Sequence, residues 1–396
     1  MDISANRQLN SVTVADNLSE GKKYNYIPVL IVALLTLVPL TSLGNILRLG
    51  VAGILFLFKD RTNSKISVRL TTVFLAMIVG VMISCITVTL VEGSANFSVT
   101  MHELQRFVFY ILLILVVYDY KVPFNYIYWI CIAILLFNFT IQILQYNDVE
   151  WVNDFIRQYY LVGKDTHLNL ATTKYGSASF RSGSIYMNPN VYMVIPCSVL
   201  CVILQANIRK PSILNYVFAV ICIWSLLLTG SRTTFIVAVA ILLVYFILDK
   251  SIGKIKWAIL AVGIVLLIFN IDNLQENFRI FDVSSGVEGS FGHKLGGLSA
   301  YLKNANPIYF VTGSLSSSLS VQVDAEWGYV FVYFGVLGLY WYVNFLHLLG
   351  RNRYTVPFLS ITLRIVICLI AMTATIVLCM PVFSFFCLVG LVEIEG

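Results

Sequence analysis

Three polar segments of this chain each place an arginine beside hydrogen-bonding side chains at the border of an apolar run. They are residues 180–190 (FRSGSIYMNPN), 228–234 (LTGSRTT) and the longer stretch 279–327. A guanidinium donates paired hydrogen bonds to phosphate oxygens and keeps its charge throughout the physiological pH range. The pattern therefore indicates an anion-binding site, with Arg181, Arg232 and Arg279 as its cationic residues.

The turn around Arg232 combines this charge with several hydroxyl groups. A new apolar helix is expected to begin there, and the free N–H groups and positive dipole end of a helix N-terminus also favour an anion. The combination fits a pyrophosphate group. The neighbouring hydroxyls belong to Thr229, Ser231, Thr233 and Thr234.

The same residues also have ordinary structural explanations, which stay open at this point. Asn188 and Asn190 are good caps for the helix expected to begin there, with Pro189 in its first turn. Ser231 can cap the next helix while Arg232 extends toward a polar interface. Only the joint placement of the segments makes a functional site the better interpretation.

The composition excludes a soluble protein. Apolar residues make up 59% of the 396 residues and charged residues only 12%, whereas soluble domains carry about 25% charged residues. The net charge of +6 is spread over the ends of apolar runs, which is typical of membrane topology and excludes a nucleic-acid-binding surface. All eight cysteines lie in apolar runs without a CxxC pair, so neither a disulfide framework nor a zinc site is expected.

Twelve apolar runs can be read as membrane-crossing helices, each of which needs about 20 mostly apolar residues. They are 26–43, 45–58, 70–91, 104–119, 122–145, 187–205, 212–229, 232–249, 255–270, 326–348, 355–378 and 380–392. The sequence therefore predicts an all-α polytopic membrane protein with about 12 transmembrane helices (11–13) in one integral domain, residues 1–396. Two connections are long, about 147–186 and about 271–325, and a polar tail, residues 1–25, precedes the first run without the features of a signal peptide.

The basic residues predict the orientation. With a cytoplasmic N-terminus, fifteen Lys and Arg residues fall on the cytoplasmic side and nine on the outside, and seven of the nine lie in the two long connections, where the positive-inside rule is weak. Both long connections are therefore expected to face the periplasm and both termini the cytoplasm. Arg48 and Arg364 fall within runs. We expect Arg48, near the outer end of its run, to extend to the interface, and Arg364 to pair with another group.

The chain resembles the O-antigen polymerase (Wzy-type) family, which belongs with the O-antigen ligases to one superfamily of membrane glycosyltransferases. The similar features are Arg181 with Asn188-Pro189-Asn190, the LTGSR turn at 228–232, and a large outer loop with Asn306-Pro307 and Gly313. Asp324-Ala325-Glu326-Trp327 followed by the GVLG stretch 335–338 completes them. The similarity extends in outline over the whole chain.

The resemblance implies a GT-C-like fold in the bacterial inner membrane and a polymerase that joins undecaprenyl-pyrophosphate-linked oligosaccharide units without a metal or other cofactor. It implies that Arg181 and Arg232 hold the diphosphate, with Arg279 a further candidate and Lys294 standing where the family often has an arginine. The candidates for the base that accepts the acceptor hydroxyl proton are Asp324, Glu326, Asp282 and His293. The implied partners are membrane lipid and a chain-length co-polymerase.

Two alternatives remain. An O-antigen ligase, which transfers the finished glycan to the lipid A core, has an essential histidine in the same large loop, and His293 keeps this reading open. A secondary transporter or lipid-linked oligosaccharide flippase belongs to another class and is expected to have short loops and charges lining its central cavity. Few charges fall within the predicted spans here, and the two long loops are not explained by transport.

Overall fold

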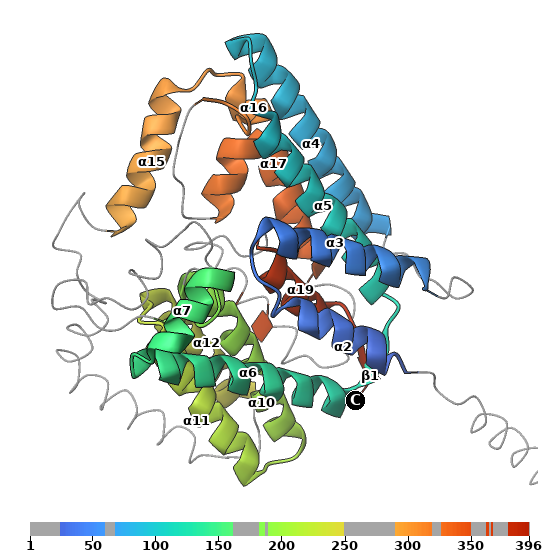
Figure 1. Cartoon of the computed structure of the whole chain (residues 1–396), viewed down its shortest axis with the longest axis vertical. Coiled ribbons are helices and arrows are strands. Elements are labelled where there is room, and N and C mark those ends of the chain that lie inside the picture. Colours follow the sequence, from blue (N-terminus) through green and yellow to red (C-terminus); the bar gives the residue numbers. More distant parts are fainter. Residues whose placement is uncertain are drawn as a thin grey trace, which may run out of the picture.

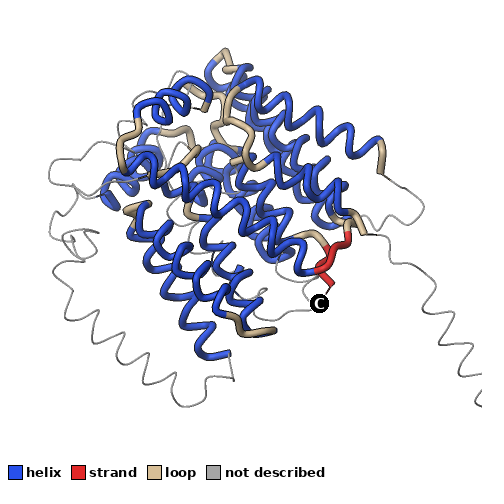
Figure 2. Tube along the Cα trace, turned by 60° about the horizontal axis from the view of Figure 1, so that its bottom comes forward, coloured by secondary structure: helices blue, strands red, loops and turns tan. Residues whose placement is uncertain are grey.

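The computed structural model of this protein describes residues 24–59, 68–160, 182–186, 189–248, 290–318, 326–349, 362–363, 366 and 379–395. Nearly all of the regular structure in this part is helical (Figures 1 and 2). The longer helices are α2 (Tyr26–Leu35), α3 (Ser42–Leu57), α4 (Val68–Glu92), α5 (Phe97–Val117), α6 (Phe124–Tyr146), α7 (Glu150–Tyr159), α10 (Val194–Arg209), α11 (Ile213–Leu228), α12 (Arg232–Leu248), α15 (Ser290–Asn304), α17 (Glu326–Leu349) and α19 (Met380–Gly390). Two short helices, α9 (Pro189–Tyr192) and α16 (Tyr309–Thr312), and two short strands, β1 (Lys121–Pro123) and β2 (Glu393–Glu395), complete the set.

Five helical stretches in the described part are long and apolar enough to cross a membrane. They are Thr71–Glu92, Phe97–Val117, Phe124–Tyr146, Asn190–Arg209 and Glu326–Phe345. Shorter apolar helices of 10–17 residues accompany them. The protein is thus all-helical, and these helices indicate a multi-pass membrane protein. The number of twelve spans stays a prediction, because the run 255–270 and nearly all of 355–378 lie outside the described residues.

The helices form two groups joined by central elements. In Figure 1 the α4–α5–α17 group (α4, α5, α15, α16 and α17) lies at the top and the α6–α10–α11 group (α6, α7 and α9–α12) at the bottom. Helices α2, α3 and α19 lie between them, and α19 packs on α2, α5 and α10. Every residue of α19 is buried. This short helix therefore belongs to the centre of the molecule, where the two groups meet.

One end of the molecule gathers the segments that the basic residues assign to the cytoplasm. The Asn25 N–H donates to the Lys121 carbonyl over 3.0 Å, and the Lys59 ammonium lies 2.6 Å from the Asp119 carboxylate. Strands β1 and β2 pair in parallel, and Lys121 forms an ion pair with Glu393 at 3.1 Å. The first and last described segments of the chain therefore share this end, as predicted for the two termini.

The long connections lie at the opposite end. Helix α6 starts beside β1 and α7 follows directly after its other end, within the first long connection. Helix α5 likewise ends near Asp119, and the residue before its start, Asn96, donates its N–H to the Ser316 carbonyl of the second connection over 3.0 Å. The described parts of both connections are therefore on one side, as the sequence predicts. Which side faces the cytoplasm remains a prediction.

The first two apolar runs form a helical hairpin whose first arm is shorter than expected. The run 26–43 is helical only to Leu35, and α3 begins at Ser42. The Arg48 guanidinium donates to the carbonyls of Leu35 and Pro39 over 3.3 and 3.1 Å, and to the Val38 carbonyl. Arg48 is fully buried, so the expectation that it extends to the interface is wrong. Carbonyls freed by a helix end inside a membrane need donors, and Arg48 supplies them.

The tip of this hairpin is tied to the first long connection. The Tyr186 hydroxyl donates to the Thr36 carbonyl over 2.9 Å, and the Tyr160 hydroxyl donates to the Leu37 carbonyl over 3.0 Å. Helix α2 has ten residues, or about 15 Å at 1.5 Å per residue. Its last residue therefore lies about halfway through a hydrocarbon core of about 30 Å.

Helix α17 reverses direction at Gly335, which has non-helical backbone angles (φ 65°, ψ −165°). The Tyr342 hydroxyl donates to the Glu326 carboxylate over 2.8 Å, although a straight helix would separate these residues by about 24 Å. A Cβ atom on Gly338 would lie 3.6 Å from the Val330 side chain. Both pairs are centred on residue 334, so the two arms run antiparallel. The run 326–348 thus contains a helical stretch long and apolar enough for a span, and its course is broken at Gly335.

The reversal is made possible by two glycines at a backbone crossing. A Cβ atom on Gly335 would lie 2.3 Å from the Val311 carbonyl oxygen, and one on Gly313 would lie 2.1 Å from the Tyr333 carbonyl oxygen. Both glycines have positive φ, 81° at Gly313 and 65° at Gly335, which L-residues adopt only with strain. The segment after α16 therefore crosses the turn of α17 at a distance that no side chain allows.

Residues from three other segments supply hydrogen bonds to the carbonyls that the reversal exposes. The Val332 carbonyl accepts from the Ser314 N–H and hydroxyl, each at 2.9 Å, and from the Tyr301 hydroxyl at 3.3 Å. The Tyr333 carbonyl accepts from the Ser84 hydroxyl of α4 at 3.4 Å. Irregular backbone is tolerated at membrane depth only when its polar groups are satisfied within the protein.

Glu92 at the end of α4 holds the second long connection in place. Its carboxylate accepts hydrogen bonds from the Tyr309 hydroxyl at 2.8 Å, the Ser318 N–H at 2.9 Å and the Ser317 hydroxyl. Burial and the hydrogen bond to Glu92 raise the pKa of Tyr309 above its ordinary value. Tyr309 is therefore a neutral donor at physiological pH, and its bond to the carboxylate persists.

Candidate functional site

Only some of the predicted site residues are described by the structure, and for some of these only the backbone is described. Arg181, Asn188, Arg279, Asp282 and Asp324 lie outside the described residues. Arg232 begins α12, and His293 and Lys294 lie in the first half of α15, but in all three cases only the backbone is described. Asn190 lies at the start of the span Asn190–Arg209 and is partly buried. Glu326, at the start of α17, is fully buried.

Two of the predicted motifs meet at the outer end of the α6–α10–α11 group. Ser182 follows Arg181 in the chain, and its N–H donates to the carbonyl of Leu228 over 2.9 Å. Leu228 is the last residue of α11 and lies four residues before Arg232. The Thr234 hydroxyl lies 2.9 Å from the Met193 sulfur between α9 and α10. The segments after Arg181 and around Arg232 are therefore neighbours in space.

A network of buried amide and hydroxyl groups fixes this junction. The Gln142 side chain of α6 donates to the Ser225 carbonyl over 3.2 Å and accepts from the Ser225 hydroxyl over 2.6 Å. The Tyr192 hydroxyl lies 2.8 Å from the same Ser225 oxygen. These bonds tie α6, α9 and α11 together without any charge.

The same helix also binds the segment that follows Arg181. Gln145 donates to the Ser184 carbonyl over 3.2 Å and accepts a hydrogen bond from the Ser182 hydroxyl. The Ser184 hydroxyl donates to the Asn138 side-chain oxygen over 2.8 Å. Residues 182–186 are all buried. A polar loop held this firmly inside a membrane protein gives the neighbouring arginines a fixed scaffold.

The α4–α5–α17 group contains buried charges instead. The Arg106 guanidinium lies 3.0 Å from the Glu103 carboxylate, one turn away on α5, and the Tyr329 hydroxyl donates to the same carboxylate oxygen over 3.2 Å. The side chains of Glu103 and Arg106 are only 2% and 13% exposed. An ion pair of this kind inside a membrane domain points to function more than to stability.

Glu326 is a second buried carboxylate close to this pair. The charges that act on the Tyr110 hydroxyl come from Arg106, Glu103 and Glu326. Arg48, Arg106 and Glu326 likewise act on the Cys379 thiol. The Tyr110 cluster, as we call it, consists of Arg48, Glu103, Arg106, Tyr110, Glu326, Tyr329, Tyr342 and Cys379. With both carboxylates ionised its two arginines are balanced.

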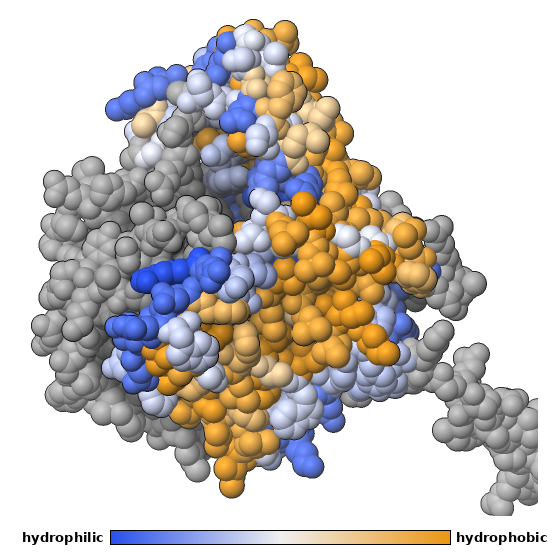
Figure 3. Space-filling view, viewed as in Figure 1, coloured by the Kyte–Doolittle hydropathy of each residue, from blue (hydrophilic) through white to orange (hydrophobic). Residues whose placement is uncertain are grey.

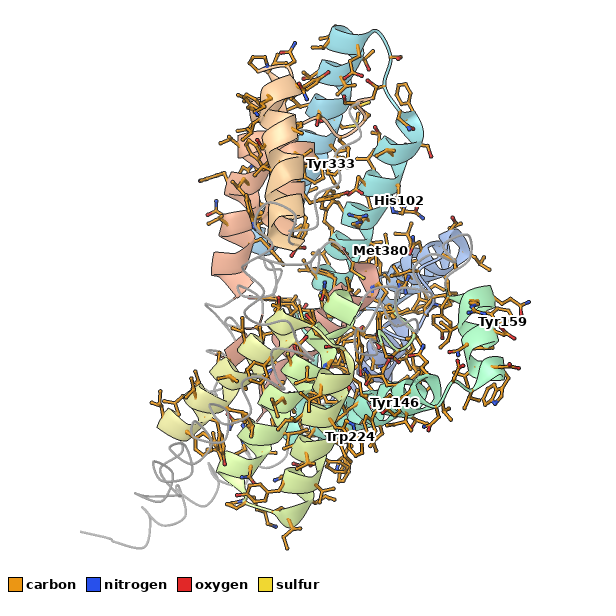
Figure 4. All side chains as sticks on the ribbon, turned by 90° about the vertical axis from the view of Figure 1, so that its left-hand side faces the viewer. His102, Tyr146, Tyr159, Trp224, Tyr333 and Met380 are labelled. Atoms are coloured by element: carbon orange, nitrogen blue, oxygen red, sulfur yellow. The ribbon has the colours of Figure 1, made fainter. Side chains whose placement is uncertain are left out.

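Interrupted helices end around the Tyr110 cluster. Helix α19 has eleven residues, so its start lies about 16 Å from the end where β2 pairs with β1. That depth is close to that of the last residue of α2, on which α19 packs. The first arm of α17 begins nearby at Glu326. Figure 4 shows Met380, the first residue of α19, between the two helix groups and below Tyr333.

The surface on this side of the molecule carries both hydrophobic and hydrophilic residues (Figure 3). Figure 3 shows a broad hydrophobic surface on the central elements and both groups, with hydrophilic residues gathered at its borders and around a hollow between α15 and α5. Glu103 lies six residues into α5, about 9 Å below its start. The cluster thus lies in the half of the molecule that contains the described parts of the two long connections.

Sequence reasoning missed most of this cluster. Arg106 is one of the nine basic residues that the sequence assigns to the outside, and it was used only for orientation, while Glu103 was not singled out. The signal was available in the run His102-Glu103-Leu104-Gln105-Arg106, where polar residues enter an apolar helix and the acid–base pair has i,i+3 spacing. The tyrosines gave no such signal, because isolated tyrosines in apolar runs are usually packing or interface residues.

No protein-family model matches the chain, and no curated protein matches it significantly.

Proposed function

We propose that this protein is a polysaccharide (O-antigen) repeat-unit polymerase that acts on the periplasmic face of the bacterial inner membrane. The acceptor hydroxyl oxygen bonds to the anomeric carbon of the growing chain. The bond from that carbon to the diphosphate oxygen breaks, and its electron pair leaves with undecaprenyl pyrophosphate. The hydroxyl proton passes to a base. Cations placed where charge develops on the leaving group stabilise this transition state.

The observation that carries the proposal is the hydrogen bond from the Ser182 N–H to the Leu228 carbonyl. It joins the segment after Arg181 to the turn before Arg232, although the two arginines are 51 residues apart in the chain. Two guanidinium groups on adjacent, firmly bonded segments suit a diphosphate, which offers two charged groups a short distance apart. Arg279 and Lys294 remain further candidates for the same role.

Glu326 is the base candidate that the structure describes best. Its buried carboxylate accepts from Tyr342 and lies within electrostatic reach of Tyr110 and Cys379. Asp324, Asp282 and His293 stay candidates on the strength of their place in the outer loop. A base on the first arm of α17 would be held by the hairpin rather than by a loop, which suits the precise geometry of proton transfer.

The test is the lipopolysaccharide ladder of a strain from which the gene is deleted, complemented with wild type, Arg181→Ala, Arg232→Ala or Arg157→Ala. We expect deletion to leave lipid A core with a single repeat unit, and both predicted-site variants to fail to restore the ladder. Arg157 is a matched control, because it lies in the same connection but pairs with Asp154 on exposed α7. An Arg157→Ala strain without a ladder, or site variants with a normal one, would count against the assignment.

The same experiment separates the ligase alternative. A ligase deletion leaves bare core while lipid-linked polymer accumulates, and His293→Ala then reproduces the deletion. His293 lies in α15 within the second long connection, at the end where Arg232 begins α12. Accumulation of polymer on the lipid carrier would therefore identify this protein as a ligase and contradict the polymerase assignment.

A second candidate, a secondary transporter or lipid-linked oligosaccharide flippase, is favoured by one specific observation. The buried Glu103–Arg106 pair lies beside interrupted helices, a combination that transporters use at their substrate sites. A flippase deletion leaves lipid-linked units on the cytoplasmic face, whereas a polymerase deletion leaves them outside. A membrane-impermeant sugar oxidation reagent applied to spheroplasts distinguishes the two, and unlabelled units would favour the flippase.

A further inference from the structure

Two buried polar atoms of the Tyr110 cluster have no hydrogen-bond partner within the described part of the chain. They are the Tyr110 hydroxyl and one carboxylate oxygen of Glu103. Tyr110 is fully buried and Glu103 is 2% exposed. A buried polar group without a partner costs about 1–3 kcal/mol. Two such atoms in one cluster indicate a site whose hydrogen bonds are completed by a ligand.

The helix places these two atoms on one face. Glu103, Arg106 and Tyr110 have i, i+3 and i+7 spacing along α5, which puts their side chains on the same side. They span about 10 Å along the axis. Side chains on a helix lean toward its N-terminus, so the Tyr110 ring points from below toward the acid–base pair. The Tyr110 ring also stacks on Phe383 at 3.9 Å between centroids, which fixes its direction.

The chemistry of the cluster favours neutral hydroxyl groups over an anion. Glu103 and Glu326 would repel a phosphate at this position, whereas the diphosphate site is expected at Arg181 and Arg232. A free carboxylate oxygen accepts from a hydroxyl, a phenol both donates and accepts, and Arg106 donates. Aromatic side chains line the same region, including Phe107 and Phe334 with ring centroids 5.6 Å apart. Hydroxyl-rich sugar rings offer matching donors, acceptors and apolar faces.

We propose that Glu103, Arg106 and Tyr110 form a subsite that binds hydroxyl groups of the acceptor sugar. This inference rests on the proposed polymerase function and deepens it. The subsite holds the incoming repeat unit beside Glu326, while Arg181 and Arg232 hold the diphosphate of the donor. Tyr329 is a positioning residue, since its hydroxyl donates to the Glu103 oxygen that also pairs with Arg106.

The test uses the full-length purified protein in lipid nanodiscs and the variant Tyr110→Phe. The donor is the lipid-linked repeat unit extracted from the deletion strain. The acceptor is the repeat-unit oligosaccharide on a short alkyl chain, which lacks a diphosphate and so cannot act as donor. We expect Tyr110→Phe to raise the acceptor KM about fivefold, the loss of one hydrogen bond, with a smaller change in kcat. Thermal stability should stay equal or rise, because the hydroxyl has no described protein partner.

Tyr309→Phe is the matched control, because its hydroxyl does have a protein partner, Glu92. It should lower thermal stability and leave the acceptor KM unchanged. Wild-type protein that forms no polymer would reject the proposed function and this subsite with it. Active wild type with an unchanged acceptor KM in Tyr110→Phe would reject the subsite alone. Loss of folding in Tyr110→Phe would also overturn it, since the hydroxyl would then serve the fold.

Discussion

The two helix groups of this protein bury polar side chains in different ways. In the α6–α10–α11 group the buried polar residues are amides and hydroxyls, and some of them, such as Gln142 and Ser225, bond one another across helices. In the α4–α5–α17 group they include the ion pair Glu103–Arg106, and two polar atoms of the cluster have no partner in the described chain. Three buried oxygens of the α6–α10–α11 group, on Asn153, Ser198 and Gln205, also lack a described partner. The two groups therefore differ in charge rather than in the completeness of their hydrogen bonds.

This difference indicates that the neutral network of the α6–α10–α11 group is a structural scaffold and that the charged cluster of the α4–α5–α17 group is a binding site. Neutral hydrogen bonds hold the segments after Arg181 and around Arg232 together, and the Gln142 and Ser225 groups that form them already have partners. Buried charges are costly in a membrane and are retained where they bind or react. The backbone follows the same division, because among the described helices the reversal in mid-course, at Gly335, belongs to the α4–α5–α17 group. In the proposed function the diphosphate is bound by residues of the α6–α10–α11 group and the acceptor sugar by residues of the α4–α5–α17 group.

The largest effect is expected at the helix reversal. Gly335→Ala introduces a Cβ atom 2.3 Å from the Val311 carbonyl oxygen at a residue with φ of 65°. We expect about 3 kcal/mol or more of destabilisation from the combined clash and strain, measured as loss of folded protein in detergent on heating. Gly53→Ala in α3 is the control, because a Cβ atom there meets nothing within 4 Å. If the Gly335→Ala and Gly53→Ala variants were equally stable, the reversal of α17 at Gly335 would be contradicted.

The next largest effect concerns the ion pair. Glu103→Gln leaves Arg106 buried without its carboxylate and should destabilise the protein by about 3 kcal/mol. The double variant with Arg106→Gln should recover most of this loss. Asp154→Asn breaks a pair of the same i,i+3 spacing on α7, whose side chains are 70% and 44% exposed, and should change stability by less than about 0.5 kcal/mol. If Glu103→Gln and Asp154→Asn lowered the stability by similar amounts, the Glu103–Arg106 pair would not be buried as described.

The smallest of these effects is expected in the neutral network. Gln142→Leu removes the amide that bonds Ser225 and should cost about 2 kcal/mol, without the ionic-strength dependence of a charged site. Thr140→Val on the same helix is the control, because the Thr140 hydroxyl is exposed and bonds only its own helix at Leu136. If Gln142→Leu abolished polymer formation while stability was retained, the scaffold would itself take part in binding.

The sequence predicted the lengths of several helices well. The runs 70–91, 122–145, 212–229 and 232–249 agree with α4, α6, α11 and α12 to within two residues at each end. Continuous hydrophobicity determines these helices, because a membrane-spanning backbone must satisfy its hydrogen bonds internally. The buried state of the described cysteines, all but Cys379 fully buried, follows from the same rule. The basic residues also predicted that the first and last described segments share one end, where Asn25 bonds Lys121 and β1 pairs with β2.

The sequence also marked the two segments that the structure brings together, after Arg181 and around Arg232. It could not show that they touch, since that contact depends on a hydrogen bond between residues 46 positions apart. The side chains of Arg181 and Arg232 themselves lie outside the described part, so their roles stay a prediction.

Tertiary structure alone decided where apolar runs break and which charges meet. The run 326–348 is mostly apolar, and the reversal at Gly335 arises from a backbone crossing with Gly313 that hydropathy does not encode. Arg48 was expected at the interface, yet it is buried because the short α2 leaves carbonyls that need its donors. Hydrophobicity is a property of each segment and can be read along the chain. The pairing of buried polar groups is a property of contacts between segments, and only the folded molecule determines it.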